Sequence, residues 1–289
     1  MAHTPVLLKE AIEYLNIGKN SNIIDATLDG GGHTRAILEK YPEVKILGIE
    51  FDPTLFKSLQ LNDDRLIKIN DSYVNLKNIV KDYKFKPDGI LFDLGLSSWH
   101  YEESGRGFSF KRNEILDMRF NPEIQPESAV DIVNKYSEDE LRELISYLGE
   151  EQFAGNIAKN IVRARREKPI IMTEDLVNVI SRSVPEWYKQ QKINFATKTF
   201  QALRVKVNDE LGNVRKGVQA AIEGLKPGGR LAVISFQGLE DKTVKEVFKE
   251  NVKAGAIKLA VKGTIRPSWE EQRTNPRSRS AKMKVAQKV

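Results

Sequence analysis

Residues 22–33, Asn-Ile-Ile-Asp-Ala-Thr-Leu-Asp-Gly-Gly-Gly-His, combine a glycine triplet with acidic side chains in a pattern that suits nucleotide binding. A short apolar run ends at Asp25, the chain breaks at the glycines, and an amphipathic segment follows, which is typical of a buried strand, a tight turn and a helix. Glycines let the backbone approach a ligand closely because they have no Cβ atom. The next apolar run ends at Glu50, whose carboxylate is expected to accept hydrogen bonds from both ribose hydroxyls of a nucleoside.

The fourth apolar run ends in Phe92-Asp93-Leu-Gly-Leu-Ser-Ser98, which places another acid at a strand end. Ligands of open α/β sheets bind beyond the carboxyl ends of the strands, so Asp93 is expected to face the ligand crevice. There its carboxylate can hydrogen-bond a cofactor amine or accept a hydrogen bond from a substrate amino group. The structural alternative is that Asp93 only caps the following turn.

The loop at residues 103–110, Glu-Ser-Gly-Arg-Gly-Phe-Ser-Phe, offers a different chemistry. Arg106 between two glycines, followed by Phe108 and Phe110, suits a loop that grips a phosphate and stacks a nucleic-acid base. On this motif alone the favoured interpretation is an ordinary loop whose phenylalanines fill the core.

A predicted helix in the middle of the chain has an apolar and a cationic side. Phe153, Ile157 and Ile161 recur at helical spacing and should be buried. The opposite side carries three cations, Lys159, Arg163 and Arg166. Such a stripe can follow a nucleic-acid backbone, although a solvated face is the commoner explanation. Residues 253–289 hold ten Lys and Arg against two Glu, a net charge of +8 in a chain of net charge +6. Two separate basic elements favour RNA or DNA as the partner.

The composition limits the alternatives. A chain of 289 residues forms one large or two ordinary domains, and 40% hydrophobic residues can bury a core. The absence of cysteine excludes disulfides, thiolate metal sites and a cysteine nucleophile, and with three histidines no metal site is predicted. No apolar run reaches the roughly 20 residues of a membrane helix. The N-terminus meets an acid before a signal-peptide core could develop. We therefore expect a cytoplasmic protein with no membrane partner.

A parallel sheet is needed to bring these strand ends together. The sequence predicts strands at 22–27, 44–50, 65–70 and 88–94, which alternate with helices at 32–41, 54–61 and 73–82. Residues 128–190 are then predicted as helices without strands. The α/β pattern resumes with a helix near 198–225, a strand at 231–236, a helix at 239–252 and strand-like runs at 257–261 and 281–286. This predicts one α/β sheet with a helical insertion and a closing antiparallel hairpin, the class I (Rossmann-like) arrangement of methyltransferases that use S-adenosylmethionine.

Several motifs then occur in an order that resembles one family. They are His3-Thr-Pro-Val-Leu-Leu, Gly31-Gly32-His33, Asp93-Leu-Gly-Leu-Ser-Ser98, Arg106-Gly-Phe-Ser-Phe110, Leu116-Asp-Met-Arg119, Ala196-Thr-Lys-Thr-Phe-Gln-Ala-Leu-Arg204 and Asn275-Pro-Arg-Ser-Arg-Ser280. Together they resemble the RsmH (MraW) family of bacterial 16S rRNA cytosine-N4 methyltransferases over nearly the whole length. The resemblance implies a class I methyltransferase domain at 1–102 and 198–289, and an inserted helical substrate-recognition domain at 103–197.

The resemblance also implies an activity and a set of site residues. The activity is methyl transfer from S-adenosylmethionine to N4 of a cytidine in the decoding region of 16S rRNA, cytosine 1402. The partner is then the small ribosomal subunit, with a homodimer as a further possibility. The expected cofactor-binding residues are Gly31, Gly32, His33, Glu50, Tyr73, Asp93 and His100. The expected substrate-binding residues are Arg106, Phe108, Phe110, Asp117, Arg119, Arg163 and Arg166, with Asp93 as the catalytic candidate near N4.

The chain departs from the family's pattern at five positions, one of which is Gly238 in place of a serine. Asp29 stands where the family usually has glycine, at the point of the turn that a cofactor approaches most closely. Glu50 stands where Asp is frequent, and His100 where Gln is common. Gln237 replaces the histidine of the family's Phe-His-Ser-Leu-Glu-Asp motif and cannot act as an ionisable base.

Two other functions remain open from the sequence. A nicotinamide-dependent oxidoreductase is disfavoured because the Gly-x-Gly-x-x-Gly spacing is missing. A catalytically weakened, methyltransferase-like RNA-binding or ribosome assembly factor is motivated by Asp29 and Gln237.

Overall fold

The computed structural model describes residues 5–289, so His3 of the opening motif lies outside the described residues. The chain divides into two compact units: Met1–Ser97 with Leu211–Val289, and Ser98–Glu210. The sequence predicts domain boundaries at 102/103 and 197/198. In the structure the chain passes from one unit to the other after Ser97 and after Glu210. The role of the second unit in substrate recognition stays a prediction.

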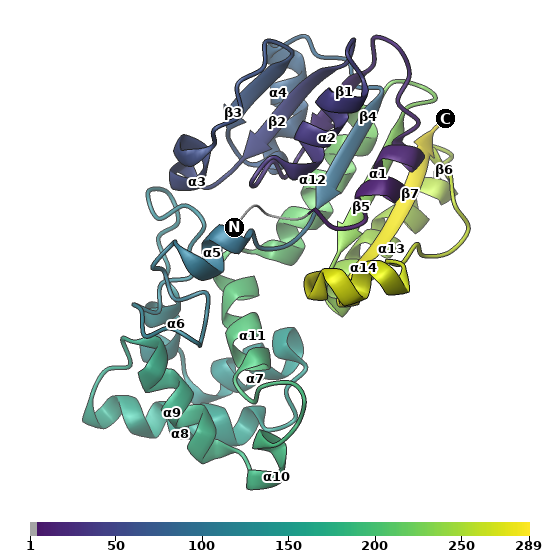
Figure 1. The fold of residues 1–289 in the computed structure, drawn as a ribbon. Coiled ribbons are helices and arrows are strands. Elements are labelled where there is room, and N and C mark those ends of the chain that lie inside the picture. Colours follow the sequence, from purple (N-terminus) through teal and green to yellow (C-terminus); the bar gives the residue numbers. More distant parts are fainter. Residues whose placement is uncertain (1–4) are drawn as a thin grey trace. The chain divides into compact units, whose positions relative to one another are not determined.

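The first unit is built on one sheet (Figure 1). In spatial order the strands are β3 (Leu66–Asn70), β2 (Lys45–Glu50), β1 (Asn22–Asp25), β4 (Gly89–Asp93), β5 (Arg230–Ser235), β7 (Lys282–Lys288) and β6 (Ile257–Leu259). The first five are parallel, and β7 runs antiparallel to both β5 and β6. The predicted class I methyltransferase sheet, with its closing hairpin, is confirmed.

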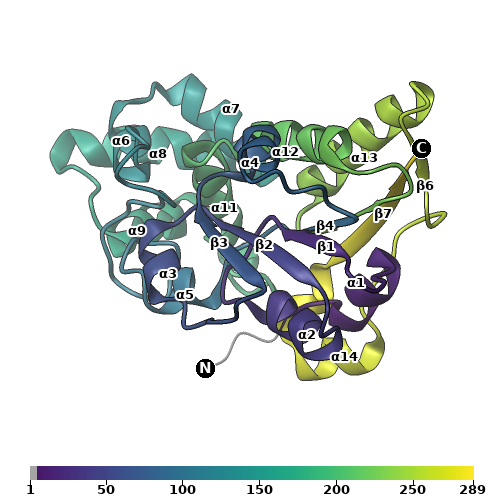
Figure 2. The ribbon, with the colours of Figure 1, turned by 90° about the horizontal axis from the view of Figure 1, so that it is seen from above.

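Helices cover both faces of this sheet (Figure 2). One face packs against α1 (Leu8–Leu15) and α2 (Gly32–Lys40). The other packs against α4 (Leu76–Asp82), α12 (Glu210–Gly224) and α13 (Gly238–Lys253). Successive strand side chains point to opposite faces, so Ile23 joins the first cluster and Ile24 the second. Burial on both faces explains why the strands are continuous apolar runs rather than alternating ones.

Short elements connect the larger ones of the first unit. They are α3 (Pro53–Ser58), the 3₁₀ helix η1 (Tyr73–Asn75), α14 (Trp269–Thr274) and the 3₁₀ helix η2 (Pro276–Ser280). Asp52 begins α3 by accepting hydrogen bonds from the backbone of Thr54 and Leu55, and Pro53 fits the first helical position because its missing N–H is not needed there.

The second unit is helical, as predicted for an insertion between the fourth and fifth strands. Its helices are α5 (Ser98–Glu102), α6 (Ala129–Lys135), α7 (Glu138–Gly149), α8 (Ala154–Glu167), α9 (Thr173–Ser183), α10 (Glu186–Lys189) and α11 (Thr197–Val207). Ser137 and Glu140 form a capping box that opens α7. None of the helices formed by residues 5–289 is long and apolar enough to cross a membrane.

The single helix predicted near 198–225 is wrong, because the chain forms α11 and α12 with a break between them. Asp209 has a left-handed backbone with φ of 44°, which ends helical geometry. The side chain of Asn208 donates to the carbonyls of Met118 (2.8 Å) and Arg204 (2.9 Å). The break is therefore fixed by a contact with a residue ninety positions away, which helical periodicity does not reveal.

Candidate active site

The carboxyl ends of β1, β2 and β4 bring three acids to one edge of the sheet. Asp25, Glu50 and Asp93 are the last residues of these parallel strands, and parallel neighbours end at the same edge. Their exposed fractions are 2%, 7% and 7%. Buried carboxyl groups that share one edge are costly unless a partner compensates them, so this edge is the first place to look for a ligand.

The Glu50 carboxylate is held by backbone amides. The N–H of Asp29 donates to Oε2 (2.9 Å) and the N–H of Asp52 donates to Oε1 (2.7 Å). Both oxygens keep lone pairs after one hydrogen bond each, so the group can still accept from hydroxyls. Burial raises the pKa of Glu50 to about 7 although these hydrogen bonds act in the opposite direction. This geometry suits the expected ribose acceptor, which stays a prediction.

The glycine turn connects β1 to α2 beside Glu50. Gly31 begins α2 with a left-handed backbone, φ of 73°, which glycine adopts without strain. A Cβ on Gly31 would lie 3.0 Å from Leu61, and one on Gly32 would lie 3.2 Å from Pro5. The turn is thus closely packed against Leu61 and Pro5. This packing favours glycine at both positions, independently of their expected contact with the cofactor.

Asp29 belongs to the turn beside the acidic edge and is half-buried. Its φ is 44°, a left-handed conformation that costs a non-glycine residue energy. Burial raises its pKa well above the usual range. The carboxylates that add to this rise are, in order of size, Glu50, Asp93, Asp25 and Asp52. Burial and the neighbouring carboxylates therefore favour the neutral form of the Asp29 carboxyl.

Asp25 and Asp93 have different surroundings within this acidic cluster, which we define as Asp25, Asp29, Glu50, Asp52 and Asp93. Asp25 accepts from the Thr34 hydroxyl (2.7 Å), and burial raises its pKa to about 6. Burial, followed by the charges of Asp25 and Glu240, raises the pKa of Asp93 to about 8. Within residues 5–289 no group of three or more His, Cys, Asp or Glu side chains is arranged to hold a metal ion.

His33 lies behind Asp93 and connects it to the N-terminal segment. Its Nε2 lies 3.1 Å from the carbonyl oxygen of Val6 and therefore carries a hydrogen, because a carbonyl only accepts. Its Nδ1 lies 3.6 Å from Oδ2 of Asp93. The ring is 5% exposed. His33 is thus placed to orient Asp93, and its expected contact with a cofactor stays a prediction.

Two buried acceptors at this edge lack partners. Oδ1 of Asp93, at the end of β4, and Oε1 of Gln237, just beyond the end of β5, accept no hydrogen bond from residues 5–289. The Glu240 carboxylate lies near both residues. It accepts a hydrogen bond from the N–H of Gln237 (3.1 Å), and its charge contributes to the raised pKa of Asp93. Buried acceptors without a donor are rare in folded proteins. A ligand with N–H groups would satisfy both.

Tyr73 follows β3 and packs inside the first unit. Its ring meets Phe92 edge to face, with centroids 5.3 Å apart. A Cβ on Gly217 of α12 would lie 2.4 Å from this ring, so glycine is required there. Its expected position against an adenine stays a prediction.

The second unit holds the other predicted site residues. His100, the last expected cofactor residue, is 3% exposed and contacts Phe108 and Phe120 edge to face, each at 5.2 Å. Phe108 stacks on Phe120 with centroids 5.5 Å apart and rings inclined by 16°. Phe110 meets Phe200 edge to face at 5.6 Å. These rings pack on one another, and their expected stacking with a base stays a prediction.

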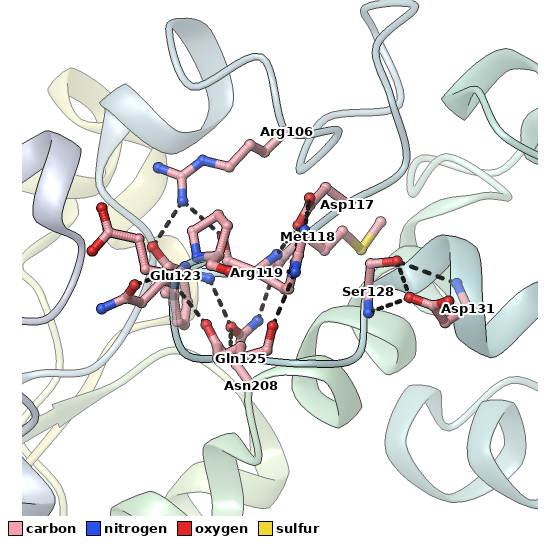
Figure 3. A network of polar contacts seen from close by, with 12 residues as sticks. Arg106, Asp117, Met118, Arg119, Glu123, Gln125, Ser128, Asp131 and Asn208 are labelled. Atoms are coloured by element: carbon pink, nitrogen blue, oxygen red, sulfur yellow. Dashed lines mark hydrogen bonds and ion pairs between the residues drawn. The ribbon is translucent and has the colours of Figure 1, made fainter.

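Arg106, Asp117 and Arg119 form a network that shapes the loop between α5 and α6 (Figure 3). Arg106 Nη1 donates to the carbonyls of Arg119 (2.8 Å) and Phe120 (2.7 Å). The Arg119 guanidinium donates to both Asp117 oxygens at 2.8 and 2.7 Å. Asp117 and Arg119 flank Met118, whose φ is 62°. These contacts give the charged groups a structural role, and their expected role in substrate binding stays a prediction.

The cationic stripe of α8 forms as predicted. Ile157 and Ile161 are buried and Phe153, at the N-cap, is half-buried. Lys159, Arg163 and Arg166 are exposed, and none of them has an ion-pair partner within residues 5–289. Exposed and uncompensated cations at one-turn spacing suit phosphate binding.

The sequence does not mark Asp25 or Gln237 as site residues. It shows Asp25 only as the end of a strand, and Gln237 only as a difference from the family's motif. The strand pattern locates Asp25, but it does not show that Thr34 of α2 donates a hydrogen bond to the buried Asp25 carboxylate. The sequence indicates only that Gln237 cannot act as an ionisable base. That its Oε1 lacks a partner within residues 5–289 depends on the packing around the end of β5.

The comparisons with known sequences cover nearly the whole chain. The sequence profile described as the MraW methylase family matches residues 1–289. A ribosomal RNA small subunit methyltransferase H from Elusimicrobium minutum is 44% identical over 99% of this chain and 98% of the relative. One of the same name from Thermosipho melanesiensis is 42% identical over 99% and 98%. A solved rRNA methylase from Streptococcus thermophilus has a TM-score of 0.43 and 11% identity over 98% of this chain and 93% of that chain.

Proposed function

The chain belongs to the MraW methylase family, and we propose that it methylates the RNA of the small ribosomal subunit. The cofactor is S-adenosylmethionine. Relatives that match almost the entire chain are named for methylation of small-subunit ribosomal RNA, which supports the substrate. The finer proposal is N4 of a cytidine in the decoding region, cytosine 1402. Membership of this family removes the nicotinamide oxidoreductase from consideration.

The acidic cluster fits the cofactor. S-adenosylmethionine carries a sulfonium and an ammonium against one carboxylate, and the cluster offers buried carboxyl groups with raised pKa values to these cations. Glu50 would accept from the ribose hydroxyls, and the glycine turn would lie along the cofactor. When bound, the cofactor supplies an electrophilic methyl group on a sulfonium. The protein then contributes mainly by positioning and by hydrogen bonds.

The two unpartnered acceptors carry the proposal for the target atom. The amino nitrogen of cytosine is a weak nucleophile because its lone pair is delocalised into the ring. An amino group has two N–H donors, and Asp93 Oδ1 and Gln237 Oε1 are two buried acceptors at the ends of adjacent strands. Acceptance of both hydrogens would hold the base and localise the lone pair on N4. Uridine, which has an oxygen at this position, would leave both acceptors unsatisfied.

We expect Gln237→Leu to lower the rate of methyl transfer about tenfold, because one neutral hydrogen bond to the amino group is lost. Gln237→Glu keeps an acceptor and should retain more activity. The substitution by leucine should not lower the melting temperature, since Oε1 has no partner within residues 5–289. Single-turnover rates with cofactor in excess measure the effect, and equal rates for leucine and glutamine would contradict it.

The function is tested by transfer of labelled methyl from S-adenosylmethionine to small subunits isolated from cells that lack this gene. Mass spectrometry of the nucleosides should find an N4-methylated cytidine, and purified large subunits serve as the control. RNA binding without any methyl incorporation would instead support the weakened assembly factor. That alternative rests on Asp29 within the acidic cluster and on Gln237 in place of histidine.

A further inference from the structure

The segment before β7 presents an exposed tryptophan among arginines. Trp269, the first residue of α14, is 75% exposed. The Arg273 guanidinium lies over its ring, with Cζ 5.4 Å from the centroid. Three more exposed arginines surround α14 in the sequence, Arg266, Arg277 and Arg279. An exposed ring flanked by cations is the combination that binds unpaired nucleotides, so we define Trp269 with these four arginines as the Trp269 platform.

The platform is held firmly, although its side chains are exposed. Ser268 caps α14 by accepting from the N–H of Glu271 (3.1 Å). Glu271 in turn accepts from the N–H of Leu7 (2.8 Å). Ile265, just upstream, exchanges two backbone hydrogen bonds with Met283 of β7 (2.9 and 2.8 Å). A rigid presentation lowers the entropic cost of binding a partner.

The platform belongs to the same edge of the first unit as the acidic cluster. Lys282, the first residue of β7, pairs with Ser235, the last residue of β5, so the preceding segment reaches the sheet where the parallel strands end. In Figure 1, α14 lies next to the beginning of β7. A second connection runs from Glu271 to Leu7 and from the adjacent Val6 to His33, behind Asp93.

We propose that the Trp269 platform binds single-stranded RNA next to the methylated nucleotide, with a base stacked on Trp269 and phosphates held by the arginines. This inference rests on the proposed function for its substrate class. Aromatic stacking with flanking cations is the usual way in which proteins bind unpaired nucleotides. The +8 charge of residues 253–289 is of the sign that a polyanion requires.

The test measures binding of fluorescein-labelled oligocytidylate by fluorescence anisotropy, without methyl transfer. Trp269→Ala should weaken binding about tenfold, and Trp269→Phe should retain most of the affinity because a ring remains. Arg266→Gln should reduce the slope of log K against log salt concentration by about 0.7, while Trp269→Phe leaves this slope unchanged. Tyr83→Ala is the matched control and should bind like wild type. Tyr83 is 49% exposed and directly follows α4. It precedes the N-terminal end of β4, whereas the acidic cluster lies at the C-terminal end of that strand.

Affinity within about twofold of wild type for Trp269→Ala, or an equal loss for Tyr83→Ala, would overturn the platform. Calorimetry should show unchanged affinity of Trp269→Ala for S-adenosylmethionine, since the indole lies outside the acidic cluster. Failure of the two proposals can be told apart. Wild type that binds oligocytidylate through Trp269 but methylates no small subunit supports the platform and contradicts the proposed function. Methylation with no effect of Trp269→Ala on RNA affinity contradicts the platform alone.

Discussion

Asp93→Ala should lower the rate of methyl transfer by about 10²- to 10³-fold at saturating S-adenosylmethionine. The reason is that Oδ1 is a buried acceptor without a partner within residues 5–289, at the strand end where the target amino group is proposed to lie. Above pH 8 the Asp93 carboxyl is charged, and a charged acceptor contributes more than a neutral one, so the loss measured there should exceed that of Gln237→Leu. Asp93→Asn, which keeps one acceptor oxygen, should fall between Asp93→Ala and wild type.

The division of the effect between kcat and KM identifies what Asp93 contacts. Loss of kcat at saturating cofactor indicates an acceptor for the substrate amine, whereas a higher KM for S-adenosylmethionine with normal kcat indicates a contact with the cofactor. Melting curves of the variants separate this loss from unfolding. Burial raises the pKa of Asp93 to about 8, so its charged form destabilises the fold at high pH. Asp93→Asn should melt no lower than wild type at pH 8. Near-normal turnover of Asp93→Ala would exclude the catalytic role.

Asp29→Gly should stabilise the ligand-free protein by about 1 to 2 kcal/mol, which raises the melting temperature by roughly 3 to 6 °C. Glycine relieves the left-handed strain at φ of 44° and removes one carboxyl group from the acidic cluster. The backbone N–H that donates to Glu50 is retained. Thermal unfolding followed by circular dichroism measures the difference.

The pH dependence separates strain from charge. A carboxyl whose pKa is raised on folding costs stability increasingly as pH rises from its unfolded pKa towards its folded one. The gain from Asp29→Gly should therefore grow between pH 4 and pH 8. Asp209→Gly is the matched control, because Asp209 has the same φ of 44° but is exposed and outside the acidic cluster. Its gain gives the size of the strain relief at an exposed position. Equal gains and equal pH profiles for the two variants would show that only strain matters at Asp29.

The sequence predicted the sheet and the strand-end acids well. Buried parallel strands give continuous apolar runs, and the acids that follow them must meet at one edge, so Glu50 and Asp93 could be located from spacing alone. The helical insertion and the closing hairpin followed from the same alternation. The cytoplasmic location and a homodimer, also expected from the sequence or the family, stay predictions.

The sequence failed where a contact between distant residues decides the structure. The break between α11 and α12 depends on Asn208 and the carbonyl of Met118. The partners of Arg106 are carbonyls of residues thirteen and fourteen positions later. Helical periodicity and motif spacing describe local order, so they contain no information about such hydrogen bonds.

By itself, then, the sequence determined the fold class, the glycine turn and the acids at the strand ends, because these depend on local pattern and on the geometry of parallel strands. Only the tertiary structure decided how the acids act. Whether Asp93 and Gln237 keep an acceptor unsatisfied depends on which groups packing brings within hydrogen-bond distance. Burial also sets the pKa of each carboxyl, and burial is a property of the folded chain alone.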